Sequence, residues 1–430
     1  LSGSNAPEGW DVKIGQRDRK VSAIGKYYRL ERTIAKLDEC VQVSDTLTST
    51  STNNIGIIVR NMTSMPDASK VHINGFPIPS LTATASETQN PPTFFAGDKG
   101  SIGFLPEDDV FRVHSQNFFF NDSKTGGIMD NQFVLRPGTS YTFKWSVYPS
   151  PKTDYYDFVN AVRRKTGVNF TIQEGFTFIH SLCRVTKDPE SQELMRKALR
   201  FAENTGIQYF CYGGTFSLFL RNDNVKNVVE PRKLFDAMRK ANPALKTFAY
   251  YHCFILDEKD PGEKYADSVS LGLNGKRNQY PASGCGRSYP LYLFIPTLEN
   301  TFGAAAAKDI DIILDEAGAD GVYWDEMEFS GPKYHYGKPW DGYTGIINQS
   351  TYQLEDYRSS IILLSQPWRV KMLERIAKAG KLLVANSQAQ TETMASYHFP
   401  RFIEAQAGVS GRASHLYTPI AYGCREFYLS

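Results

Sequence analysis

The sequence predicts an α/β protein in which an antiparallel β-sandwich domain precedes a (β/α)8 barrel of the TIM type. Three observations carry this prediction. Short apolar runs separated by turn residues fill residues 20–149, strand-like runs alternate with amphipathic helical segments beyond residue 154, and no glycine-rich phosphate loop follows the first of these later strands. The first pattern is typical of a sandwich and the second of a parallel sheet with helical crossovers, while the third disfavours a dinucleotide-binding fold.

The composition is that of a globular protein without a polyanionic partner. The chain has 430 residues, of which 41% are hydrophobic and 22% charged, so it can bury a large core. Its 48 basic and 46 acidic residues leave a formal net charge of +2, too small to attract nucleic acid or an anionic membrane. Because no apolar run approaches the roughly 18 residues that span a bilayer, we also expect no membrane span.

Cysteine and aromatic usage narrow the chemistry further. The six cysteines include no C-x-x-C pair, so the sequence indicates neither a zinc site nor a redox motif, and we expect no metal and no cofactor. Aromatic residues make up 13% of the chain, which suits a protein that stacks on ring-shaped ligands, although a β-rich core explains part of this excess.

The β-sandwich domain is expected over residues 1–152. Its strand-like runs include "NIGIIVRNM", "KVHINGFPI", "DVFRVHSQNFFF" and "VLRPGTSYTFKWSVYP", and the last of these is expected to form the clearest strand pair. Glycine, proline, asparagine and aspartate separate the runs, as turns require.

A linking helix is expected over residues 153–172. The run "DYYDFVNAVRRKTG" changes the apolar period from two to about 3.6, and Gly167 is the expected end of the helix. One face of this helix is apolar and carries Tyr155, Phe158, Val159 and Val162.

The barrel is expected over residues 173–430. Helices begin near residues 188, 230, 301 and 365, the last of them capped by Ser365, and seven strands are expected to begin near Phe176, Ile207, Phe248, Val322, Leu383, Phe402 and Leu416. The run "YPLYLFIPT" is assigned to a loop because no helix separates it from the third strand. The eighth unit is therefore expected to be missing or irregular, as in a chain truncated at Ser430.

The carboxyl ends of barrel strands are where active sites are assembled, and acidic residues gather there. Cleaving a glycosidic bond requires two carboxylates, one that donates a proton and one that attacks or activates water. We expect Asp325 and Glu404 to be this catalytic pair, with Glu328 as a further catalytic candidate. Alternation along the strand should place Tyr323 and Asp325 on one face and Trp324 and Glu326 on the other.

Other side chains at these strand ends could bind sugar, as could Trp340 of "KPWDGY" in the long loop that is expected to cover the mouth of the barrel. Flat apolar faces and hydrogen-bonding groups suit pyranose rings, and the substrate-binding candidates are Trp324, Trp340, His180, Tyr251, His252, Asn386 and Glu326. Structural roles stay open for several of these acids and aromatics. Glu326 and Glu328 could be solvated or paired with Lys333 or Arg358, Glu404 could pair with Arg401 or Arg412, and Trp340 could pack under its own loop.

The stretch "YWDEME", residues 323–328, is similar to the W-x-D-M-N-E segment of the α-glucosidase-type family of retaining glycoside hydrolases. Aspartate after the fourth strand with a proton donor at or after the sixth also resembles the α-galactosidase-type clan. The resemblance implies that Asp325 is the nucleophile and Glu404 the acid/base. The chain departs from the pattern at Met327, where the family has Asn, and at Glu404, where it usually has Asp.

A longer pattern, "YTFKWSVYP...DYYDFVNAVRR...GVNFTI", resembles a group of bacterial glycoside hydrolase-like proteins in which a sandwich precedes a barrel. We therefore predict a glycosidase that acts on a poly- or oligosaccharide, is retaining by resemblance, and works in an extracellular or periplasmic location. A non-catalytic carbohydrate-binding protein on a degenerate or truncated barrel is the main alternative. A metal-dependent hydrolase is disfavoured because the first strand offers only His180. A Schiff-base aldolase is disfavoured because Lys246 and Lys381 lie at strand starts.

Overall fold

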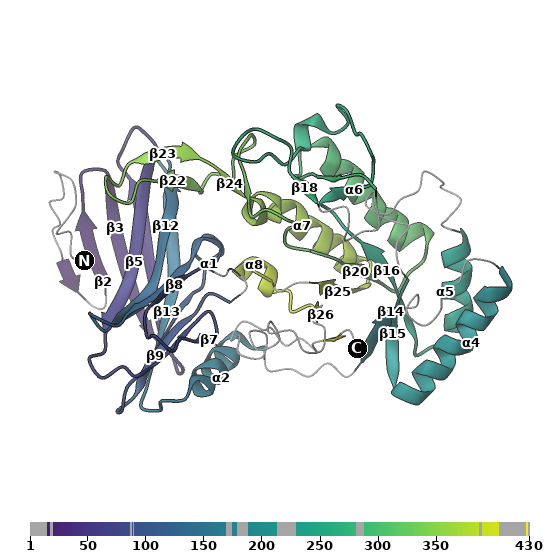
Figure 1. Cartoon of the computed structure of the whole chain (residues 1–430), viewed down its shortest axis with the longest axis horizontal. Coiled ribbons are helices and arrows are strands. Elements are labelled where there is room, and N and C mark those ends of the chain that lie inside the picture. The colour runs from purple at the N-terminus through teal and green to yellow at the C-terminus, as the bar shows by residue number, and fades with distance from the viewer. Residues whose placement is uncertain are drawn as a thin grey trace.

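Two bodies of β-structure make up the protein, an antiparallel sandwich and a parallel sheet with helices (Figure 1). The computed structural model describes residues 15–17, 20–86, 88, 90–168, 174–178, 188–212, 229–280, 288–386, 389–403 and 427–428. In Figure 1 the sandwich lies on the left and the parallel sheet on the right, with helix α2 between them below and α8 between them above it.

The sandwich consists of two antiparallel sheets. The nine-stranded sheet has the order β1 (Gly15–Arg17), β2 (Lys20–Ile24), β3 (Tyr28–Lys36), β4 (Val41–Ser49), β13 (Ser140–Ser150), β10 (Ser101–Pro106), β9 (Thr93–Ala96), β6 (Lys70–Ile73) and β7 (Phe76–Pro77). The four-stranded sheet has the order β5 (Ile55–Ser64), β12 (Thr125–Leu135), β11 (Gln116–Phe120) and β8 (Ala83–Ala85). Both sheets contribute to one apolar core that includes Phe95, Phe104, Phe119, Phe133 and Phe143.

Two local predictions for this domain are wrong. The run "DVFRVH" forms helix α1 (Asp109–His114) rather than a strand, because the Asp108 carboxylate accepts a hydrogen bond from the Phe111 N–H and caps it. The expected strand pair around residues 134–149 is divided between the two sheets. Strand β12 pairs with β5 and β11, whereas β13 pairs with β4 and β10, so the turn between them crosses from one sheet to the other.

The predicted linking helix is α2 (Tyr155–Thr166). Asp154 caps its start, Gly167 ends it in a left-handed conformation with φ 69°, and its apolar face is buried as expected. The ring of Tyr155 stacks on His72 of β6, with 4.3 Å between centroids and 4° between planes. These contacts attach α2 to the sandwich.

The parallel sheet has its strands in chain order, as a barrel does: β14 (Gly175–Phe178), β15 (Ile207–Tyr212), β16 (Lys246–Tyr251), β20 (Gly321–Trp324), β25 (Leu382–Asn386), β26 (Arg401–Ile403) and β27 (Phe427–Tyr428). The first six match the predicted strands. The prediction near Leu416 lies outside the described residues, and β27 is the seventh strand that the structure describes. Among the described residues no pairing joins β27 to β14, so the sheet shows the strand order of a barrel but not its closure.

Helices follow the strands as the βα pattern predicts. They are α4 (Asp188–Thr205), α5 (Val229–Ala241), α6 (Thr301–Asp311) with its π-helical continuation η4 (Ile312–Glu316), α7 (Ile361–Lys378) and the short α8 (Glu392–Ala395). Helix α7 begins after Ser360 and not at Ser365, whose hydroxyl instead donates to the Ile361 carbonyl within the helix. None of the helices in the described ranges is long and apolar enough to cross a membrane.

The segment between β16 and α6 forms a small antiparallel sheet of its own. Strand β19 (Leu291–Leu293) pairs with β17 (Ile255–Leu256) and β18 (Gln279–Tyr280), and a single 3-10 turn, η2 (Ala266–Ser268), lies between β17 and β18. The apolar run at Tyr289 therefore lies outside the parallel sheet, but its assignment to a loop is wrong because Leu291–Leu293 form the central strand of this small sheet.

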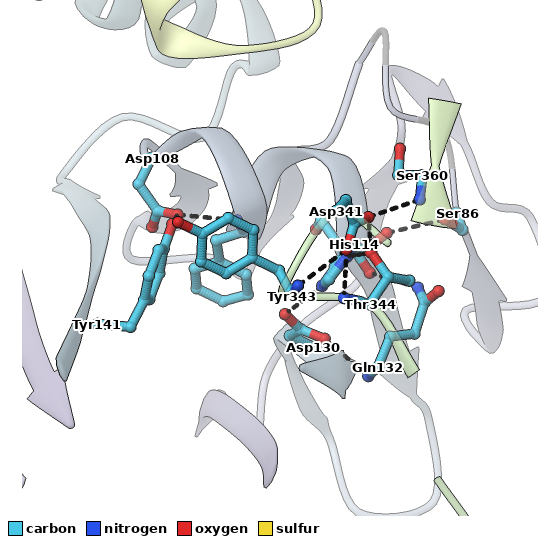
Figure 2. A network of polar contacts seen from close by, with 12 residues as sticks. Ser86, Asp108, His114, Asp130, Gln132, Tyr141, Asp341, Tyr343, Thr344 and Ser360 are labelled. Carbon is cyan, nitrogen blue, oxygen red and sulfur yellow. Dashed lines mark hydrogen bonds and ion pairs between the residues drawn. The ribbon is translucent and has the colours of Figure 1, made fainter. Parts of the chain in front are cut away.

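The segment between β20 and α7 reaches across to the sandwich. It contains the strands β21 (Tyr334–His335), β22 (Gly345–Ile347), β23 (Leu354–Tyr357) and β24 (Ser359–Ser360), and the β22–β23 hairpin lies over the sandwich in Figure 1. A buried polar network fastens it there (Figure 2): the His114 ring contacts Asp130 and Thr344, each at 2.9 Å, and Asp341 accepts the backbone N–H of Thr344. The middle of this segment is thus docked on the sandwich.

The stacked His72 gives the sandwich a pH-dependent stability. Burial lowers the pKa of His72 from 6.5 to about 4, so between these values the unfolded chain binds a proton that the folded chain does not. Above pH 6.5 His72 is neutral in both states and does not reduce the free energy of unfolding. As the pH falls from 6.5 toward 4, protonation of His72 in the unfolded chain should lower the free energy of unfolding. The variant His72→Phe keeps a ring against Tyr155 but has no group that titrates there. Its free energy of unfolding, measured in urea at several pH values, should fall less between pH 6.5 and pH 4 than that of the wild type. Equal pH slopes for both proteins would contradict the assignment.

Candidate active site

The two faces of β20 have different surroundings. One face joins an aromatic cluster that includes Phe176, Phe248 and Tyr323, with Tyr250 packed against it. The other face packs on the helices, where Trp324 makes an edge contact with Trp368 of α7 at 5.9 Å. Asp325 follows Tyr323 by two residues and lies on the aromatic face, as the alternation predicts, because the Tyr250 hydroxyl reaches it.

Two expected sugar contacts are corrected by this arrangement. Trp324 and Tyr251 are both 0% exposed and belong to the core between the sheet and the helices. The Tyr251 hydroxyl donates to the Ala306 carbonyl of α6 at 2.9 Å, so its polar group is satisfied inside the protein. Neither ring can stack on a pyranose from this position.

Asp325 is held by three hydrogen-bond donors from three segments. The Tyr250 hydroxyl donates to Oδ2 at 2.5 Å, the Asn386 amide donates to Oδ1 at 2.6 Å, and the Glu326 backbone N–H donates to Oδ1 at 3.0 Å. Burial raises the pKa of Asp325, and His252 and the Tyr250 hydrogen bond oppose that rise. The carboxyl ends of β16, β20 and β25 thus converge on one fixed carboxylate.

Glu326 leaves the path of the strand. Its φ of 46° lies in the left-handed region, which costs a residue with a Cβ about 1 kcal/mol or more. The side chain therefore turns away from the Trp324 face and meets His252, with 3.1 Å between Nε2 and Oε2. The prediction that Glu326 shares a face with Trp324 is wrong because it assumed an extended backbone.

The Glu326 carboxylate is an acceptor for three side chains. Besides His252, the Ser330 hydroxyl donates at 2.5 Å and the Tyr280 hydroxyl at 3.3 Å. The Phe254 N–H donates to Nδ1 of His252, so Nε2 carries the proton and donates to Glu326. Burial alone would raise the pKa of Glu326, but the hydrogen bond and electrostatic interaction with His252, together with the hydrogen bonds from Ser330 and Tyr280, outweigh it and lower the pKa.

Glu328 has a structural environment. Its side chain is 1% exposed and forms a buried ion pair with Arg369 of α7, and the Gln390 N–H donates to it at 3.4 Å. Burial raises the pKa of Glu328, and Arg369 opposes that rise. Glu328 therefore forms an ion pair, one of the structural roles expected from the sequence, although its partner is Arg369 rather than Lys333 or Arg358. We withdraw Glu328 as a catalytic candidate because its carboxylate is enclosed and neutralised.

Three further candidates lie elsewhere or outside the described residues. Trp340 belongs to the segment docked on the sandwich, where its indole N–H donates to the Thr344 carbonyl at 2.8 Å and its ring contacts Tyr357. This corrects its assignment to the mouth of the barrel and agrees with packing within its own loop. His180 and Glu404 lie outside the described residues.

Sequence reasoning missed three side chains that organise the site: Tyr250, Tyr280 and Ser330. Alternation from Phe248 could have identified Tyr250, since both lie on the face that carries Asp325. Tyr280 reaches Glu326 from the two-residue strand β18 and Ser330 from a loop, and both segments are too short or irregular to give a periodic signal in the sequence. In the described part of the chain, no group of three or more His, Cys, Asp or Glu side chains is placed to hold a metal ion.

Comparison with solved structures identifies the fold. The chain is similar to the GH36 α-galactosidase AgaB from Geobacillus stearothermophilus, with a TM-score of 0.61 and 12% identity over 95% of this chain and 60% of that one. The fold is glycoside hydrolase-like. An α-galactosidase from Lactobacillus brevis has a TM-score of 0.56 and 10% identity over 95% of this chain and 64% of its own.

A variant of the GH36 α-galactosidase AgaA from Geobacillus stearothermophilus, in complex with stachyose, has a TM-score of 0.59 and 12% identity over 98% of this chain and 62% of that one. The chain thus spans 60% to 64% of the length of these three enzymes. No family model and no curated protein matches the sequence. At these identities the likeness establishes the fold alone.

Removal of Arg369 should be costly because it leaves the Glu328 charge buried without a partner. We expect Arg369→Met to lower the free energy of unfolding by about 3–5 kcal/mol, measured in urea at pH 7. The double variant Arg369→Met with Glu328→Gln should recover part of that loss. A matched control is Arg375→Met on the same helix, whose ion pairs with Asp311 and Asp315 are partly exposed and should contribute about 1 kcal/mol or less. Equal losses at Arg369 and Arg375 would contradict the structural assignment.

Proposed function

We propose that the protein hydrolyses glycosidic bonds with Asp325 as the nucleophile. The observation that carries the proposal is one carboxylate at the carboxyl end of β20, on the aromatic face of the sheet, fixed by Tyr250, Asn386 and the Glu326 amide. This is where barrel enzymes assemble their catalytic groups. The glycoside hydrolase-like fold and the resemblance of residues 323–328 to a retaining family support the same role.

The hydrogen bonds distinguish the two oxygens of Asp325. Oδ1 accepts from both Asn386 and Glu326, whereas among the described residues Oδ2 accepts only from Tyr250. A carboxylate oxygen with one donor keeps a lone pair for another partner. In the proposed reaction Oδ2 attacks the anomeric carbon while an acid protonates the departing oxygen, and water then hydrolyses the glycosyl ester.

The proposed acid is Glu404, carried by the resemblance alone. About 5–5.5 Å between the Asp325 and Glu404 carboxyl groups would fit retention, and about 6.5–9.5 Å would fit inversion. Asn386 holds Asp325 and His252 holds Glu326, so we assign both a supporting role rather than a substrate contact. His180 stays a candidate for binding substrate hydroxyls.

We propose α-galactosides as the first substrate class because the solved structures with this fold include α-galactosidases. We also propose an extracellular or periplasmic location, because polysaccharides are found there.

A non-catalytic carbohydrate-binding protein is the second candidate function. The same fold can carry catalytic and non-catalytic proteins, so the glycoside hydrolase-like fold alone does not distinguish the two functions. Turnover by the wild-type protein separates the two functions directly.

Replacement of the nucleophile is the decisive test of the proposal. We expect Asp325→Asn to lower kcat on an aryl α-galactoside or on stachyose by about 10³-fold or more, because the attacking charge is lost. Azide should restore turnover to Asp325→Ala and give a glycosyl azide, since a small anion can occupy the vacated space. Asp315→Asn, at an exposed aspartate of η4 just before β20, is the control and should leave kcat unchanged.

Two outcomes would contradict the nucleophile assignment. An unchanged kcat in Asp325→Asn would mean that another acid is the nucleophile. Wild-type protein that binds oligosaccharide without turning it over would favour the carbohydrate-binding function instead.

A further inference from the structure

The turn after β20 has a backbone that only its surroundings can maintain. Glu326 adopts φ 46°, a conformation that side chains with a Cβ rarely adopt without external support. That support comes from three segments: His252 follows β16, Tyr280 ends β18, and Ser330 lies four residues further along the chain. The carboxylate of Glu326 is therefore clamped on several sides, and 31% of its side chain stays exposed.

The clamped turn has a direct effect on Asp325. It presents the Glu326 N–H to Oδ1 of Asp325 at 3.0 Å. In an extended continuation of β20 this N–H would instead point along the sheet toward a neighbouring strand. The strand ladder is kept on either side of the turn, since the Asp325 N–H donates to the Tyr251 carbonyl and the Met327 N–H to the Asn386 carbonyl. The distortion is thus confined to the residue that orients the carboxylate.

We infer that Glu326 is a positioning residue for Asp325: its carboxylate, held by His252, Tyr280 and Ser330, fixes the turn whose amide orients the proposed nucleophile. This replaces the expected role of Glu326 as a substrate contact, and its kinetic test rests on the proposed function. In this role Glu326 acts through Asp325 and lowers the barrier of the chemical step without binding the sugar.

Glu326 also acts on Asp325 through its charge. The titratable groups around Asp325 are Cys211 of β15, Tyr250 of β16, Tyr323 of β20, His252 and Glu326. The negative charge of Glu326 raises the pKa of Asp325, whereas His252 lowers it. A neutral residue at position 326 should therefore lower the pKa of Asp325, an effect that a purely structural side chain would not produce.

A series of substitutions at position 326 tests the inference. Glu326→Gln keeps an acceptor for His252, Glu326→Gly accepts the left-handed backbone without strain, and Glu326→Ala does neither. We expect kcat to fall in the order Gln, Gly, Ala, with Ala about 10–100-fold below wild type and KM little changed, because misplacement of a catalytic group acts on the chemical step. Glu355→Ala, at a glutamate of the docked β22–β23 hairpin, should leave both constants unchanged.

A raised KM at unchanged kcat would make Glu326 a substrate contact and overturn the inference. A Glu326→Ala protein with wild-type constants would overturn it as well. If Glu326→Ala fails to fold, Ser330→Ala removes one hydroxyl of the clamp and should lower kcat in the same direction, and an unchanged kcat would count against the clamp.

A carbon-13 titration of the Asp325 carboxyl, assigned through Asp325→Asn, gives a readout that needs no turnover. We expect a lower Asp325 pKa in Glu326→Gln than in wild type, and an unchanged pKa would overturn the coupling. Loss of the proposed function alone would appear as absent turnover in wild type while this pKa difference persists, so the two failures are distinguishable.

Discussion

The alternation of side chains along β20 is the constraint on which the site depends. A strand covered by helices on one face and by aromatic rings on the other can present only every second residue to the site, so Tyr323 and Asp325 lie together while Trp324 is enclosed. The strand pairs with β16 and β25, and both neighbours supply donors to Asp325. One buried carboxylate is thereby fixed by the geometry of the sheet itself.

The two acids that follow Asp325, Glu326 and Glu328, are stabilised in different ways. Glu328 is neutralised by Arg369 in the interior, which ties the turn to α7. Glu326 stays partly exposed and is held by the side chains of His252, Tyr280 and Ser330, at the cost of a left-handed backbone. Beyond them the chain crosses to the sandwich, where His114, Asp130 and Thr344 form a buried contact (Figure 2). The sandwich therefore anchors the segment that begins at the site.

Much of the fold was predictable because apolar periodicity reports burial directly. Six parallel strands and the helix α2 lie where the pattern placed them, and Asp325 faces the predicted side. The failures have physical causes that periodicity does not encode. An N-cap at Asp108 turned a strand-like run into α1, and a single left-handed residue redirected Glu326. Trp340 was predicted to stack on a sugar, but its indole packs within the segment that is docked on the sandwich.

Trapping of the covalent intermediate tests the role of Asp325 most directly. A mechanism-based fluoroglycoside that forms a slowly hydrolysed glycosyl ester can be incubated with the protein, and the modified peptide located by mass spectrometry. A nucleophilic Asp325 predicts one glycosyl unit per chain, attached within the peptide that contains residues 320–330 and absent from Asp325→Asn. A label on any other carboxylate, or turnover of the parent glycoside with no label at all, would contradict the assignment.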